Sequence, residues 1–312
     1  MRRVAPAWAI LAIGAAACAS SPPAATAPAG SPLVVEVDRP PASPSARPAV
    51  APDEPPPERL APGSLPRAMR ESLRRLVEGQ DAADAAIFRR AHEQLAGDDM
   101  SGARRSFFEL IQKTPSSPLV PYAYLAFGDM SFADAEAGDP TKYALAAQAY
   151  AEVLKYPPPV NRAYAYAQHQ RGIVARRQGD VQAALSSQRS AISALAQDRE
   201  APLRDAILAA SRRELALAYA DVGAPDKAVA FFEASDIEGA SGLVVALGRE
   251  YAKRGAAREA IVLYEAALQR VKGSALCEAA ASSYRALSAT ADASLRQALT
   301  RAEAQRQSRC GP

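Results

Sequence analysis

The sequence predicts an all-α fold, built as a row of helical hairpins behind a non-globular N-terminal segment. Three observations predict it. The 312 residues are rich in alanine and only 6% aromatic, which favours helices over sheets because alanine costs least in a helix interior. From Ser64 onward proline becomes sparse and apolar residues recur with a helical period. A spacing of small and aromatic residues then repeats along the chain.

Residues 1–17 have the three-part pattern of a secretory signal peptide. Arg2 and Arg3 precede an apolar run that is too short for a membrane-spanning helix, and small residues at 15–17 suit a cleavage site. Cys18 follows directly, so the segment resembles the lipobox of bacterial lipoproteins, although position 15 holds alanine where leucine is commoner. That resemblance implies lipidation of Cys18, and the absence of aspartate at position 19 favours the outer membrane. The alternative is an ordinary cleaved signal with an incidental Cys18.

The next two segments are predicted from proline content and periodicity. Residues 18–63 are rich in proline, alanine and serine, a composition that buries too little apolar surface to fold and predicts a disordered tether. Residues 64–80 then hold an N-terminal helix, expected from about 65 to 78 with Ser64 as its cap. Leu65, Met69, Leu73 and Leu76 form one stripe of that helix.

A five-position pattern recurs through residues 81–271. In its clearest copy Ala216, Tyr219, Gly223, Ala228 and Phe232 are separated by three, four, five and four residues. The copies that begin at Gly172 and Gly248 keep the same intervals, and two weaker copies begin at Ala91 and Gly128. We expect the small residues where two helices cross, the aromatic residues between helices, and a glycine with positive φ at the end of each first helix, at Gly179, Gly223 and Gly255.

These copies resemble the tetratricopeptide repeat, whose period is about 34 residues. The resemblance implies a right-handed α-solenoid of about five helical hairpins, because a single hairpin cannot bury its own apolar face. Residues 272–312 would add a pair of capping helices. Cys277 and Cys310 lie in this pair and are either a disulfide, as an oxidising compartment would allow, or two thiols. A plain helical bundle with coincidental alanine spacing is the alternative fold.

Composition and motifs argue against several functions. The formal net charge is +3, from 37 basic and 34 acidic residues, so no strong field favours nucleic acid. The only histidines, His92 and His169, have no metal-ligand spacing, and no phosphate-binding or nucleophile motif occurs. We therefore expect no enzyme activity, no cofactor, no metal and no small-molecule substrate.

The resemblance implies a peptide-binding groove lined by the first helix of each hairpin. Aligning the small positions places nine candidate residues there: Tyr122, Asp129, Tyr166, His169, Arg176, Arg177, Arg213, Arg249 and Lys253. Cationic residues predominate, and arginine binds carboxylates with two parallel donors, so an acidic or C-terminal peptide is the expected ligand. The alternative is a solvated helix face with ordinary arginine content.

The sequence thus predicts a non-catalytic protein-interaction scaffold with protein or peptide partners in the cell envelope. The expected location is the periplasmic face of a bacterial outer membrane, reached through the lipid anchor; a soluble periplasmic or secreted protein is the alternative. Two other functions stay open: regulation of a peptidoglycan synthase or hydrolase, and an enzyme with an unrecognised site.

Overall fold

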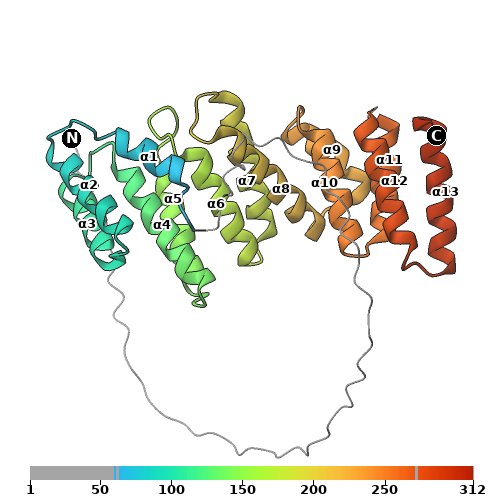
Figure 1. Ribbon diagram of the computed structural model, residues 1–312, viewed down its shortest axis with the longest axis horizontal. Coiled ribbons are helices and arrows are strands. Elements are labelled where there is room, and N and C mark those ends of the chain that lie inside the picture. The colour runs from blue at the N-terminus through green and yellow to red at the C-terminus, as the bar shows by residue number, and fades with distance from the viewer. Residues whose placement is uncertain (1–59, 61–62, 271–272, 312) are drawn as a thin grey trace, which may run out of the picture. The chain divides into compact units, whose positions relative to one another are not determined.

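The computed structural model describes residues 60, 63–270 and 273–311, and in these ranges every regular element is helical (Figure 1). The predicted all-α class is confirmed for this part of the chain. The predicted signal peptide, Cys18 and nearly all of the predicted tether lie outside the described residues. Among the described residues, no helix is both long enough and apolar enough to cross a bilayer.

Thirteen α-helices are present in the described ranges, and all but the first form consecutive pairs. The first helices of the pairs are α2 (Ala83–Ala96), α4 (Val120–Glu136), α6 (Tyr164–Arg177), α8 (Arg204–Val222), α10 (Ala240–Lys253) and α12 (Ser274–Ser288). The second helices are α3 (Met100–Lys113), α5 (Lys142–Val153), α7 (Val181–Gln197), α9 (Ala228–Ser235), α11 (Ala257–Arg270) and α13 (Ala293–Cys310). A short 3₁₀ turn, Pro225–Lys227, precedes α9.

Contacts between helices run from each pair to the next in chain order. Along the chain, α6 contacts α8, α8 contacts α10 and α10 contacts α12, while α11 contacts α13 on the second-helix side. This order is the one expected for stacked hairpins. The right-handed solenoid itself stays a prediction.

The repeat pattern places its large residues in the core. The aromatic position of the second helices holds Phe107, Tyr150, Phe232 and Tyr264, each with 0% exposure, and in α7 the equivalent Gln188 is 1% exposed. The small residue of the first helix lies directly against this side chain: a Cβ added to Gly128 would come within 2.6 Å of Tyr150 Cε1. Glycine is therefore required there because the buried ring occupies the space that a side chain would need.

Two details of the sequence prediction are wrong. Gly179 and Gly255 end their helices with φ of +80° and +68°, as expected, but Gly223 has an extended backbone with φ of −80°. Its missing side chain serves packing instead, since an added Cβ would collide with the Tyr219 ring.

The first helix, α1 (Arg67–Arg75), is shorter than expected and is not capped by Ser64. Pro66 occupies the N-cap position, where its fixed φ suits the entry into a helix. Asp292, by contrast, caps α13 with its side chain, which accepts a hydrogen bond from the Leu295 backbone N–H.

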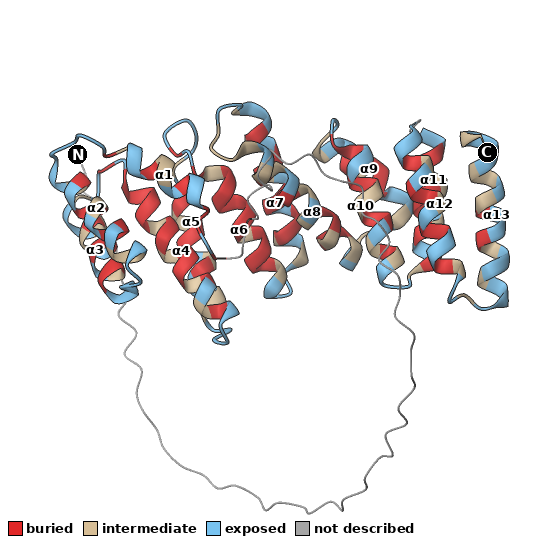
Figure 2. Cartoon of the chain, viewed as in Figure 1, coloured by how far each residue is buried: buried red, intermediate tan, exposed pale blue. Residues whose placement is uncertain are grey.

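Buried residues continue through the successive pairs and become few in the last helix (Figure 2). In α13 only Leu299 and Ala302 are buried. The structure contains the Cys277–Cys310 disulfide, which joins α12 to the end of α13 with a Cα–Cα distance of 6.0 Å. A covalent link thus supplements the sparse apolar contacts of the terminal helix.

Candidate peptide-binding groove

The candidate site is the surface formed by α2, α4, α6, α8, α10 and α12, here called the first-helix face. The nine predicted groove residues all lie on these helices. They divide into two groups, because the N-terminal part of the face is covered by another segment of the chain and the C-terminal part is open.

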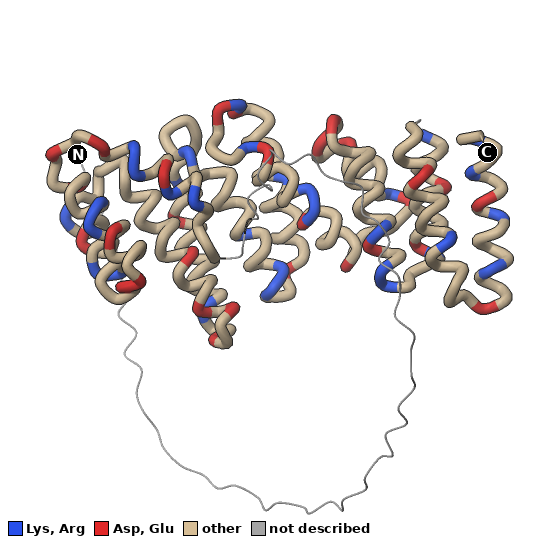
Figure 3. The backbone as a smooth tube through the Cα atoms, in the orientation of Figure 1, with Lys and Arg blue, Asp and Glu red and all other residues tan. Residues whose placement is uncertain are grey.

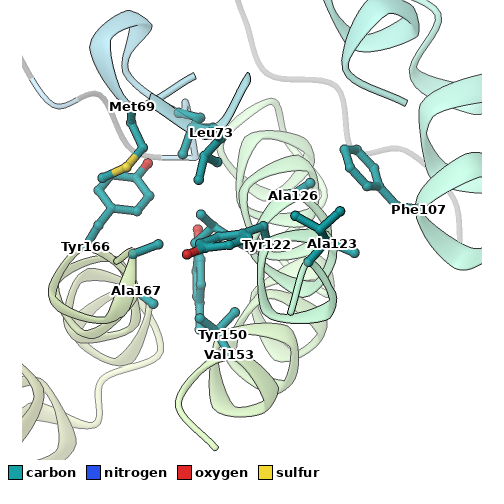
Figure 4. Packing of buried hydrophobic residues seen from close by; sticks show 14 of the residues in the cluster. Met69, Leu73, Phe107, Tyr122, Ala123, Ala126, Tyr150, Val153, Tyr166 and Ala167 are labelled. Atoms are coloured by element: carbon teal, nitrogen blue, oxygen red, sulfur yellow. The ribbon is translucent and has the colours of Figure 1, made fainter. Parts of the chain in front are cut away.

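Segment 63–77, which contains α1, covers the N-terminal part of the first-helix face. Met69 is 0% and Leu73 is 1% exposed, and both belong to one apolar cluster with Tyr122 and Tyr166 (Figure 4). Leu65 and Val77, which flank α1, belong to the same cluster, whereas the predicted stripe residue Leu76 is only partly buried. The sequence predicted this amphipathic helix, but its partner surface could not be read from the pattern.

Four predicted groove residues are buried and offer no surface to a ligand: Tyr122, Asp129, Tyr166 and His169, each at most 5% exposed. This corrects the sequence prediction, which placed them on an open face. The reason is physical: an uncovered face with tyrosine and leucine side chains would expose much apolar surface, and segment 63–77 removes it from water.

The polar atoms of these four residues bond within the protein. The Tyr150 hydroxyl donates to Asp129 Oδ1 at 2.6 Å, and the Tyr166 hydroxyl lies 3.5 Å from Asp129 Oδ2 and 3.1 Å from the Ser64 carbonyl oxygen. Burial raises the pKa of Asp129 to about 7, against the lowering effect of the two tyrosine hydrogen bonds. Raised carboxyl pKa values also occur in catalytic sites, but this carboxyl is enclosed by aromatic hydroxyls and core side chains.

His169 is likewise a core residue. Its Nδ1 atom lies 3.1 Å from Gln188 Oε1 on α7 and 3.2 Å from Ser211 Oγ on α8, and the Gln188 amide donates to the His169 carbonyl at 3.0 Å. Burial lowers the pKa of His169 to about 4; the Gln188 hydrogen bond opposes this, and the nearby Arg213 charge adds to it. The ring is therefore neutral near pH 7 and links three helices.

Replacing His169 with glutamine is expected to reduce the acid sensitivity of the fold. The unfolded chain binds a proton near pH 6.5 whereas folded His169 binds one only near pH 4, so stability is lost as pH falls through this window. The loss amounts to about 3 kcal/mol, at about 1.4 kcal/mol per pKa unit. Urea unfolding of wild type and His169→Gln between pH 7 and pH 4 measures this difference. The titration of His92 and Asp129 affects both proteins equally and cancels in the comparison. If the unfolding free energies of both proteins fell equally as pH decreased, this prediction would be wrong.

Two predicted cations are neutralised by glutamates of neighbouring first helices. Arg176 Nε lies 3.2 Å from Glu214 Oε2 on α8, and Arg177 Nε lies 2.8 Å from Glu136 Oε1 on α4. These ion pairs connect successive hairpins across the face. Arg176 and Arg177 therefore hold structural partners already and are weaker candidates for ligand binding than the sequence suggested.

The other three predicted cations remain available in the open part. Arg213 on α8 and Arg249 on α10 are exposed and have no acidic partner among the described residues. Lys253 has 77% of its side chain exposed and lies 3.9 Å from Glu250 in its own helix. Basic and acidic positions are interspersed along the described chain (Figure 3), so this region is distinguished by unpaired arginines rather than by a large net field.

Arg249 also lines a pocket of ≈1020 Å³ between α10 and α13. Its wall carries four further arginines and a single acidic residue, Glu278; the arginines are Arg270, Arg285, Arg306 and Arg309. Arg306 is paired with Glu303 at 2.7 Å, and Arg309 donates to the Leu268 carbonyl at 3.3 Å. The pocket was not predicted, because Arg285, Arg306 and Arg309 were placed in a capping helix pair; the signal was their shared positive charge near the C-terminus.

The unpaired arginines of this arrangement suit binding of carboxylates. In the described ranges no group of His, Cys, Asp or Glu is placed to hold a metal ion. A comparison with protein-family models gives no match, and a search of curated proteins finds no similar sequence. The likeness to tetratricopeptide repeats therefore rests on the residue intervals in the sequence.

Proposed function

We propose that this chain is a non-catalytic protein-interaction scaffold whose open first-helix face binds acidic peptide segments. The observation that carries the proposal is a pair of exposed arginines on successive first helices, Arg213 of α8 and Arg249 of α10, which have no acidic partner among the described residues. Guanidinium groups bind carboxylates with two parallel hydrogen bonds, and rigid helices hold them at a fixed separation.

The surrounding features support a binding role. Arg249 borders the arginine-lined pocket, so an acidic segment that contacts α8 and α10 has further cationic partners at α12 and α13. The pocket has the size that ligand sites commonly have, up to about 1,000 Å³. Acidic side chains of a bound peptide would thus meet several arginine donors in a concave site whose described lining holds one carboxylate, Glu278.

The sequence supports a place for this scaffold in the cell envelope. Residues 1–18 read as a lipoprotein signal, which leads us to propose a lipid-anchored protein on the periplasmic face of a bacterial outer membrane, where it would help to assemble or position an envelope complex. Cys277 and Cys310 form a disulfide in the structure, and such bonds persist in oxidising compartments.

Reversing the two arginine charges tests the binding site. A short fluorescein-labelled peptide that alternates glutamate and glycine should bind wild type, and Arg213→Glu with Arg249→Glu should weaken it by at least about tenfold, which corresponds to about 1.4 kcal/mol. Fluorescence anisotropy measures the affinity, and the glutamine version of the peptide should not bind.

The matched control reverses two exposed arginines of second helices, Arg105→Glu with Arg301→Glu. It makes the same change in net charge away from the first-helix face, so it should leave affinity nearly unchanged. Equal loss in both variants would indicate a nonspecific charge effect, and no loss in either would exclude this face as the carboxylate site.

A further inference from the structure

The covered part of the first-helix face resembles an occupied binding site. Segment 63–77 presents large apolar residues at every fourth position to this face: Leu65, Met69, Leu73 and Val77, each at most 7% exposed. Such spacing is the recognition pattern of an amphipathic helix that lies in an apolar groove. On the groove side, Tyr122 and Tyr166 come from two different first helices, α4 and α6.

The segment is fitted to the face at its N-terminal end. Gly63 has φ of +64°, and a Cβ added there would lie 2.5 Å from the Ala133 backbone nitrogen and 2.9 Å from the Asp129 carbonyl oxygen. The chain therefore passes against the backbone of α4 where only glycine fits. The Tyr166 hydroxyl then binds the Ser64 carbonyl oxygen at 3.1 Å. These contacts indicate specific docking rather than loose coverage.

The chain beyond the C-terminal end of α1 is held by hydrogen bonds from α2. Arg89 of α2 donates to the carbonyl oxygens of Val77 at 3.0 Å and Gln80 at 2.7 Å, just beyond the end of the helix. Within α1, Arg67 pairs with Glu71 at 2.8 Å. A helix of nine residues is also too short to be stable alone, since isolated helices below about 12 residues are marginal in water. Its helical form depends on the groove.

We propose that the face of α2, α4 and α6 beneath α1 is a docking site for a short amphipathic helix, and that α1 is its resident occupant. α1 detaches while the hairpins stay folded, and a partner helix with large apolar residues at every fourth position takes its place. This site is separate from the arginine-lined open part, so the absence of acidic-peptide binding there would not exclude it.

A binding experiment on the full chain tests the site. The variant Met69→Ala with Leu73→Ala removes much of the apolar contact of α1, which frees the groove. A fluorescein-labelled synthetic peptide of residues 63–80 should bind this variant at least about tenfold more tightly than wild type, because the resident helix reduces the competent fraction of wild type. A peptide with aspartate at positions 69 and 73 should not bind.

The matched control is Arg75→Ala, which changes an exposed residue of the same helix and should bind the peptide as weakly as wild type. Equal peptide affinity of the double variant and wild type, with α1 amides unprotected in the variant, would overturn the proposal.

Hydrogen exchange on wild type tests the same site without relying on the variant's folding. Backbone amides of 70–75 should exchange at least about tenfold faster than those in the middle of α4, as expected for local opening. Exchange of both helices at one common rate would show that α1 leaves only in global unfolding, and would contradict a detachable occupant.

Discussion

Replacing Tyr150 with alanine is expected to lower the free energy of unfolding by about 5 kcal/mol. Removing a fully buried aromatic side chain typically costs about 3–5 kcal/mol through lost burial and the cavity left behind. Here the loss is compounded because Tyr150 packs directly on Gly128 and donates to the buried Asp129 carboxyl at 2.6 Å. Urea unfolding followed by circular dichroism at 222 nm, the helix signal, measures the change.

The conservative variant Tyr150→Phe separates packing from hydrogen bonding. It keeps the ring against Gly128 but leaves Asp129 Oδ1 without its tyrosine donor, so a loss of about 2 kcal/mol is expected. If Tyr150→Ala costs no more than Tyr150→Phe, the ring does not fill the crossing between α4 and α5, and the packing explanation for the repeat pattern fails.

Removing the disulfide is expected to be the second large effect. The bond joins residues 33 positions apart, and closure of a loop of this length contributes roughly 4 kcal/mol in the chain-entropy account. Cys277→Ser with Cys310→Ser should therefore lower the unfolding free energy by about that amount. The loss should concentrate in α13, where few side chains are buried.

Hydrogen exchange resolved by helix checks the location of this effect. Amides of α13 should lose protection in the double serine variant, whereas those of α4 and α6 should change little. Wild type in reductant should behave like the variant, and the variant should not respond to reductant. Unchanged exchange in α13 would show that apolar contacts alone hold the terminal helix.

The helical pairs could be predicted because local chemistry determines them. Alanine and glycine at fixed intervals with aromatic residues, as in Ala216, Tyr219 and Phe232, report the crossing of two helices that are neighbours in sequence. The buried Phe107, Phe232 and Tyr264 occupy the positions that this spacing assigns to them. Gly223 shows the limit of the pattern: the residue was identified, but its role is close packing against Tyr219 rather than a positive φ.

The site could be predicted only in part, because its availability depends on contacts between distant segments. The stripe of Met69 and Leu73 indicates an amphipathic helix, yet no local signal says that it lies against Tyr166, about a hundred residues further along the chain. The pairing of Arg176 with Glu214 could not be predicted from the sequence either, since many glutamates could be its ion-pair partner. Arg213 and Arg249 remained correct candidates for exposed cations because nothing in the described structure covers or neutralises them.

A site-specific photo-crosslink tests the central claim, that acidic segments bind the open first-helix face, most directly. A photoreactive amino acid replaces Leu217, one turn beyond Arg213 on α8, or Phe108, an exposed residue of the second helix α3. We predict that the glutamate-containing probe peptide crosslinks to position 217 and not to position 108, and that Arg213→Glu with Arg249→Glu abolishes the crosslink. Equal crosslinking at both positions, or a crosslink at 217 that survives the charge reversal, would contradict the account.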